Sequence, residues 1–93
     1  MENKTLDQTK TNPLSIKKLK WQCRRGMLEL DVILIPFLEN HYESLSNNQK
    51  LVFTDLLNEA DPDLFTWIMN FGLCENVDFN GIIQIIREKM AVA

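Results

Sequence analysis

The chain has 93 residues, of which 45% are hydrophobic and 25% are charged, and its net charge is −3. A chain of this length forms one domain and buries about 60–65% of its unfolded surface, which leaves little room for an internal cavity. Three glycines and three prolines indicate long regular elements with few turns. These totals exclude a two-domain organisation and fit an ordinary globular protein.

The charge is unevenly distributed along the chain. Residues 1–26 contain seven Lys or Arg and two acids, whereas residues 27–93 contain three Lys or Arg and eleven acids. A basic start and an acidic remainder predict a dipolar surface, which favours oriented docking to a charged partner. Nucleic-acid binding favours a domain that is basic as a whole, so we expect no nucleic-acid partner.

The start of the chain is polar and rich in threonine. We expect a disordered tail over residues 1–12 and a helical domain over residues 13–93. The tail lacks the apolar segment of a signal peptide. The longest apolar run, residues 32–38, has seven residues, far fewer than the roughly 20 that a membrane helix needs. We therefore expect a cytoplasmic protein that does not insert into membranes and keeps its two cysteines reduced.

Five helices and no strand are predicted. The first helix begins at Asn12 and Pro13, a typical N-cap and first helical residue, and runs to about Arg25. Gly26 follows the paired arginines. Cations in the last turn and a left-handed glycine beyond it are typical of a helix C-terminus.

The second helix is predicted from Met27 or Leu28 to Tyr42. Its middle, residues 32–35, is apolar on every side, which predicts a central helix surrounded by the others. We assign Leu28 and Val32 to its inward side. A proline within the helix predicts a kink.

The last three helices begin at recognisable caps. Ser46 and Gln49 fit a capping box at the start of the third helix. Asp61 fits an N-cap, followed by a proline, for the fourth helix, and Gly72 is expected to end that helix. The fifth helix is expected to begin near Asp78 and carries a regular apolar stripe. Together these features predict a compact five-helix bundle of the all-α class.

No catalytic constellation is recognisable. His41 is the only histidine, so a histidine metal cluster is not expected. The three glycines are isolated, so no phosphate-binding loop is expected either. We therefore expect that the protein is not an enzyme and that it has no cofactor or metal of its own. Trp21 and Trp67 are interpreted as core or rim aromatics. A solvated face is expected for the basic residues of the first helix: Lys17, Lys18, Lys20, Arg24 and Arg25.

The segment RRGMLELD, residues 24–31, joins the first two helices. In a continuous helix Arg25 and Glu29 would form a pair worth only about 0.2–0.5 kcal/mol, whereas glycine costs about 1 kcal/mol relative to alanine. Gly26 is therefore expected in a turn, or where another backbone comes close. In the turn, Arg25 and Glu29 would point outward and form a corner suited to docking.

The same segment carries a family resemblance. Residues 25–29 match the RGxxE motif of the small flavinylation assembly factors for succinate dehydrogenase and fumarate reductase. The likeness continues with the order W-x-C-R-R-G-M-x-E-L-D, then P-F-x-E, then D-P-D-L-F-x-W-x-M, across about residues 20–72. The chain is thus similar to the bacterial members of that family.

The resemblance implies an assembly factor that transiently binds the flavoprotein subunit of succinate dehydrogenase or fumarate reductase, its client. The factor would promote the covalent bond between FAD and a histidine of the client, and the FAD would belong to the client. It would act by favouring the conformation in which the two groups meet. The expected partner-binding residues are the motif, Arg25, Gly26 and Glu29, and three neighbours added by adjacency: Arg24, Met27 and Asp31.

Three other functions are open to a chain of this kind. One is an antitoxin-like regulator that uses the same surface, a second is a nucleic-acid binder that uses residues 17–25, and a third is a permanent subunit of a larger complex. The acidic remainder of the chain disfavours the second. We expect a monomer, and nothing in the residues predicts direct contact with FAD.

Overall fold

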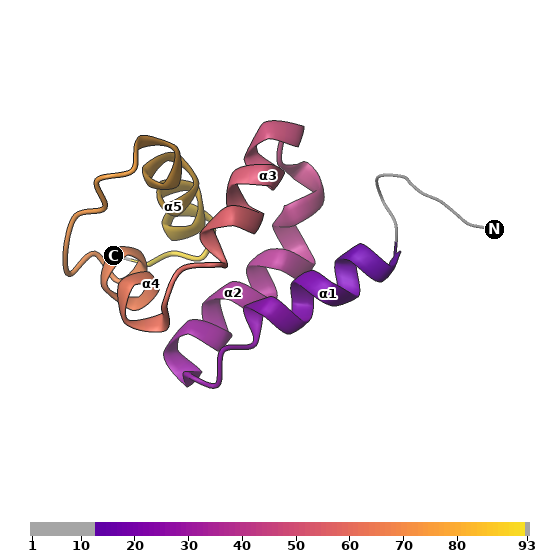
Figure 1. Ribbon diagram of the computed structural model, residues 1–93, viewed down its shortest axis with the longest axis horizontal. Coiled ribbons are helices and arrows are strands. Elements are labelled where there is room, and N and C mark those ends of the chain that lie inside the picture. Colours follow the sequence, from indigo (N-terminus) through magenta and orange to yellow (C-terminus); the bar gives the residue numbers. More distant parts are fainter. Residues whose placement is uncertain (1–12, 93) are drawn as a thin grey trace.

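A computed structural model of the protein describes residues 13–92, and within this range it contains five α-helices and no strand. This confirms the predicted all-α class. The expected disordered tail, residues 1–12, and the expected cap at Asn12 lie outside the described residues. Figure 1 shows the elements: α1 (Pro13–Cys23), α2 (Leu28–His41), the 3₁₀ turn η2 (Tyr42–Ser44), α3 (Asn47–Leu56), α4 (Asp61–Ile68) and α5 (Val77–Lys89).

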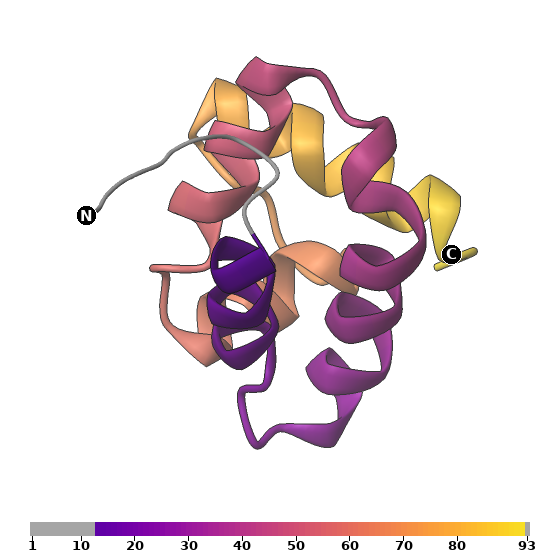
Figure 2. The same ribbon diagram turned by 90° about the vertical axis from the view of Figure 1, so that its right-hand side faces the viewer.

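The helices α1 and α2 form an antiparallel pair, and the loop that joins them protrudes at the bottom of Figure 2. Helix α2 also contacts α4 and α5, and α5 packs against α2, α3 and α4. The loop between α4 and α5 lies at the left in Figure 1, far from α1 at the right. The molecule therefore has a charged α1–α2 end and a distant α4–α5 end.

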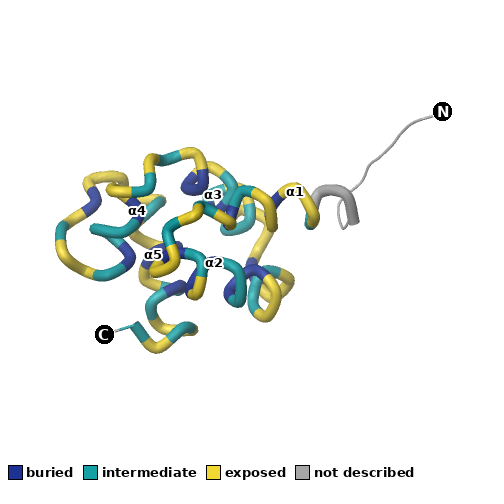
Figure 3. Tube along the Cα trace, turned by 90° about the horizontal axis from the view of Figure 1, so that it is seen from below, coloured by how far each residue is buried: buried dark blue, intermediate teal, exposed yellow. Residues whose placement is uncertain are grey.

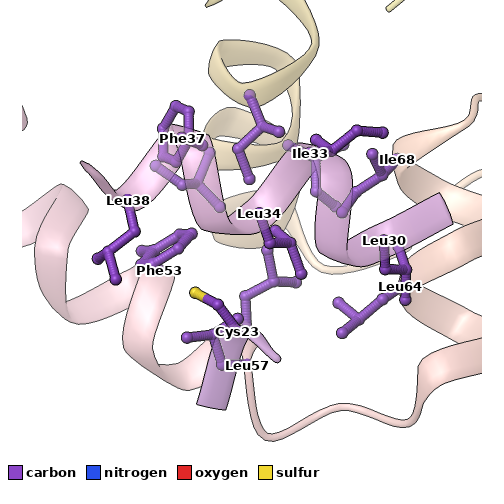
Figure 4. Packing of buried hydrophobic residues seen from close by; sticks show 14 of the residues in the cluster. Cys23, Leu30, Ile33, Leu34, Phe37, Leu38, Phe53, Leu57, Leu64 and Ile68 are labelled. Carbon is purple, nitrogen blue, oxygen red and sulfur yellow. The ribbon is translucent and has the colours of Figure 1, made fainter. Parts of the chain in front are cut away.

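The core is built from apolar side chains of all five helices, as the dark segments of Figure 3 indicate. Leu34 and Phe37 of α2 are fully buried, and the Phe37 ring lies 5.5 Å from that of Phe53 in α3. Cys23 at the end of α1 packs near Leu57 (Figure 4). The predicted helical stripes thus meet in one continuous cluster.

Helix α2 is central, as predicted, since it contacts α1, α4 and α5, but it is not covered on every side. The exposed fraction of Leu28 is 72% and that of Val32 is 56%, so their assignment to the inward side was wrong. The inward face is occupied by Leu30, Leu34 and Phe37. The helical period places Leu28 and Val32 on the opposite face. Because the neighbouring helices cover only one side of α2, it keeps an apolar outer face.

Of the two helix caps that the sequence predicted for α3 and α4, the first is observed and the second is not. The capping box of α3 is confirmed, since Ser46 Oγ accepts from Gln49 N at 3.1 Å and Gln49 Oε1 accepts from Ser46 N at 2.8 Å. At α4 the N-cap is Ala60, and Asp61 is the first helical residue. The predicted cap at Asp61 was wrong because its carboxylate is engaged elsewhere, as described below.

Two helix ends also differ from their predicted positions. Helix α1 ends at Cys23, before the paired arginines. Helix α4 ends at Ile68, and Asn70, with φ of 64°, supplies the left-handed residue instead of Gly72. The N–H of Phe71 then donates to the carbonyl of Thr66 at 2.8 Å, which closes a Schellman motif.

Replacing Leu34 by alanine tests which side of α2 faces the core. Leu34 is fully buried, so Leu34→Ala is expected to lower the free energy of unfolding by about 2–5 kcal/mol. The matched change Val32→Ala removes an exposed side chain and is expected to cost less than about 1 kcal/mol. Urea denaturation followed by circular dichroism measures both values, and equal losses would contradict the observed orientation of α2.

Candidate functional site

The loop between α1 and α2 turns at Gly26. Its φ of +83° lies in the left-handed region, where a side chain is strained. A Cβ atom built on Gly26 would meet no other atom within 4 Å. The glycine is therefore required by the turn and not by close packing inside the fold, and its backbone is open to an approaching molecule.

The guanidinium group of Arg25 is the centre of a hydrogen-bond cluster. Its Nε donates to Asp61 Oδ1 at 2.6 Å, and its Nη2 donates to the carbonyl of Glu59 at 2.8 Å. Its Nη1 donates to the carbonyl of Leu57 at 2.7 Å and to that of Gln22 at 2.9 Å. The guanidinium group thus donates four hydrogen bonds to other groups of the protein.

These bonds fasten three parts of the fold to one another. The carbonyls of Gln22 and Leu57 lie at the C-terminal ends of α1 and α3, where helices leave carbonyls without an internal partner. The bond to Asp61 adds the start of α4 and a charge-assisted interaction. Only 14% of the Arg25 side chain is exposed. The expectation that Arg25 points outward was therefore wrong, because the ends of these helices hold it against the protein.

Asp31 fixes the same loop from the other side. Its Oδ1 atom accepts a hydrogen bond from the backbone N–H of Arg25 at 2.7 Å. Asp31 lies in the first turn of α2, so its carboxylate also faces the positive end of that helix. Asp61 was not predicted to belong to this cluster, because its only local signal was that of a helix start.

Other residues of the predicted site remain at the surface. Arg24, Gly26 and Glu29 are exposed, whereas Met27 is half-buried and packs against the core. The structure thus divides the predicted set into two groups. Arg25 and Asp31 build the corner, and Arg24, Gly26 and Glu29 are displayed on it. We call the displayed residues, Arg24, Gly26 and Glu29, the Gly26 corner.

The cysteine next to this corner is chemically quiet. Cys23 is fully buried, and this burial raises the pKa of its thiol to about 12. The nearby Arg25 guanidinium acts in the opposite direction but is outweighed. Cys74 is also free and buried. Neither thiol is therefore presented as a nucleophile or a metal ligand.

The described residues hold no group of three or more His, Cys, Asp and Glu side chains that could bind a metal ion. Among the same residues, no helix is both long and apolar enough to cross a membrane. The features that the corner offers are an open backbone, one exposed cation and one exposed anion. Such a surface can bind another macromolecule in a fixed orientation.

Conservative replacement of the two neighbouring arginines separates their roles. Arg25→Lys exchanges a planar fork for a single ammonium and leaves part of the carbonyl cluster unpaired, so it is expected to cost about 1–3 kcal/mol of stability. Arg24 is exposed, and Arg24→Lys is expected to change stability by less than about 0.5 kcal/mol. Urea titrations of the two variants provide the comparison. Equal stabilities would show that the cluster contributes nothing to the fold.

The buried thiol predicts how stability depends on pH. An unfolded chain releases the Cys23 proton near the ordinary thiol value of 9.0, whereas the folded protein holds it to about pH 12. The unfolded state therefore binds fewer protons above pH 9, and the free energy of unfolding falls as pH rises, by up to about 1.4 kcal/mol per pH unit. Denaturation between pH 8 and 10 measures this slope. The Cys23→Ala variant should show a shallower slope, and an unchanged one would exclude this source.

Comparisons with known proteins found relatives that cover most of the chain. A family model described as "Flavinator of succinate dehydrogenase" matches residues 17–90. A protein of Colwellia psychrerythraea named FAD assembly factor SdhE is 43% identical over 90 residues, which cover 95% of this chain and 99% of that protein. A protein of the same name from Vibrio cholerae is 46% identical over 69 residues, covering 74% of this chain and 80% of that protein.

The fold is also found in a solved structure. A solution structure described as that of UPF0350 protein is 41% identical in sequence, covers 85% of each chain and superimposes with a TM-score of 0.70. The match to the family model includes the whole corner, the end of α1 and the helices α2, α3 and α4. From this agreement of sequence and fold, the chain belongs to the family described as flavinator of succinate dehydrogenase.

Proposed function

We propose that this protein is an assembly factor that binds the flavoprotein subunit of succinate dehydrogenase, the client, and promotes its covalent flavinylation. The observation that carries the proposal is the match, over almost the full chain, to a protein named FAD assembly factor SdhE. The match to the family described as flavinator of succinate dehydrogenase supports the choice of client. The fumarate reductase flavoprotein is proposed as a further client, on the basis of the RGxxE motif.

The Gly26 corner is proposed to be the contact with the client. Gly26 offers an open stretch of backbone, and the exposed Glu29 carboxylate stands three residues further along, at the start of α2. The Arg25 cluster holds this arrangement before any partner arrives. A surface that is already ordered loses little conformational entropy on binding, which favours affinity for the client.

The factor is proposed to act by positioning and not as an enzyme. Its exposed corner would bind more tightly to the client conformation in which the FAD and the accepting histidine meet, and so would increase the population of that conformation. The FAD is proposed to belong to the client. We propose that the factor acts as a monomer in the cytoplasm and leaves the client afterwards.

Two substitutions at the corner test this proposal. Glu29→Ala removes the exposed carboxylate, and Gly26→Arg fills the open backbone at a cost of about 1–2 kcal/mol for the left-handed conformation. Both variants are expected to remain helical by circular dichroism and to reduce covalent flavin in the client at least tenfold. Flavin fluorescence of the denatured client after gel electrophoresis measures the bound cofactor.

Matched controls lie elsewhere on the surface. Gly81 in α5 is exposed, a Cβ atom there meets nothing within 4 Å, and it does not have a positive φ, so Gly81→Arg adds the same side chain without strain. Glu75→Ala removes an exposed carboxylate from the α4–α5 loop. Both controls should retain wild-type flavinylation. Full flavinylation with the two corner variants would falsify the role proposed for the corner.

A further inference from the structure

Large apolar side chains are exposed on the outer sides of α1 and α2. The exposed fraction of Trp21 in α1 is 75%, and those of Leu28 and Val32 in α2 are 72% and 56%. Tryptophan is on average one of the more buried residues, and it is enriched among the side chains that dominate binding energy at protein interfaces. Its position on the surface of so small a protein therefore suggests a contact with another molecule.

The apolar residues of α2 form a continuous stripe. Leu28, Val32 and Ile35 follow one another at spacings of four and three, which places them on one face of the helix. The first two are exposed and Ile35 is half-buried. Leu28 and Val32 lie opposite the buried residues of α2 and serve no packing role within the described part of the fold, whereas Ile35 also packs against the core.

An ion pair joins this stripe to α1. Lys20 Nζ in α1 lies 2.9 Å from Glu39 Oε2 in α2. Glu39 is four residues after Ile35 and seven after Val32, so it continues the same helical face. The outer sides of the two helices therefore meet along this pair and form one surface. We call it the outer surface and define it by Trp21, Leu28, Val32 and Ile35.

Positive charge surrounds Trp21, at the α1 side of the outer surface, whereas the charged residues of α2 are acidic. Lys17, Lys20 and Arg24 line one hollow together with Trp21. The sequence of α1, PLSIKKLKWQC, contains no acidic residue. An acidic side chain on a partner would therefore be attracted to this side of the molecule, while apolar groups of the partner would cover Trp21 and the stripe.

Position and charge indicate which partner fits. The stripe begins at Leu28, two residues after Gly26, so the outer surface is continuous with the Gly26 corner. A nucleic acid would match the cations but would bury the aliphatic stripe against phosphates. The client that docks at the corner is the partner that uses both features.

We propose that the outer surface is a second part of the docking site and binds an apolar area on the client that is edged by acidic side chains. This inference rests on the function proposed above and names the chemistry of the contact. Trp21 is its central anchor, the α2 stripe widens the apolar contact, and the α1 cations orient the approach. Binding should therefore weaken with increasing salt.

The experiment measures binding of the purified apo-flavoprotein subunit of succinate dehydrogenase to the full chain and its variants. Trp21→Ala and Val32→Glu are expected to raise Kd at least tenfold, because each removes or disrupts a desolvated apolar contact. Phe71→Ala is the control for the first, since Phe71 is an aromatic with 70% exposure in the distant α4–α5 loop. Leu51→Glu is the control for the second, on the exposed side of α3. Both controls should bind within twofold of the wild type, and circular dichroism verifies that all variants are folded.

The outcomes separate this inference from the proposed function. If Trp21→Ala or Val32→Glu binds within twofold of the wild type while Glu29→Ala binds weakly, the outer surface is not a docking site and the corner still is. If the wild-type protein does not bind the client, both proposals fail. Tight binding of a 20-base-pair DNA duplex at 150 mM salt that is lost in Trp21→Ala would assign the surface to nucleic acid and overturn the inference.

Discussion

The guanidinium group of Arg25 connects parts of the chain that are distant in sequence. It donates to oxygen atoms at the end of α1, at the end of α3, in the α3–α4 loop and at the start of α4. The apolar core holds the helices together, but it does not by itself determine where their ends lie. The hydrogen bonds of Arg25 set the position of the α1–α2 loop, and everything displayed on that loop depends on them.

The RGxxE motif therefore combines two kinds of residue. Its arginine is turned into the fold and shapes the corner, whereas its glycine and glutamate face the solvent. A surface of this kind is prepared before binding, which suits a factor whose proposed task is to select one conformation of its client. The outer surface adds apolar area beside the corner. Together they form the binding side that we propose for this small protein.

Local patterns in the sequence were sufficient to predict the helices. The capping box at Ser46 and the stripe of α5 were confirmed, because caps and periodicity depend on residues close in the chain. The orientation of Val32 was predicted wrongly, because an apolar residue within an apolar run gives no sign of which side is covered. The role of Arg25 was also hidden, since its ion-pair partner Asp61 is 36 residues away. Contacts over such separations arise only from the assembled fold, whereas the exposed Gly26 turn followed from local energetics alone.

Three of the four oxygen atoms around the Arg25 guanidinium belong to the main chain, at positions 22, 57 and 59. Every amino acid carries a backbone carbonyl, so these positions can vary in sequence without losing the acceptor. What they cannot tolerate is a change in the length of the α3–α4 connection, which would move the carbonyls away from the guanidinium. Among natural variants we therefore expect the length of this connection to be preserved, with insertions and deletions confined to other loops.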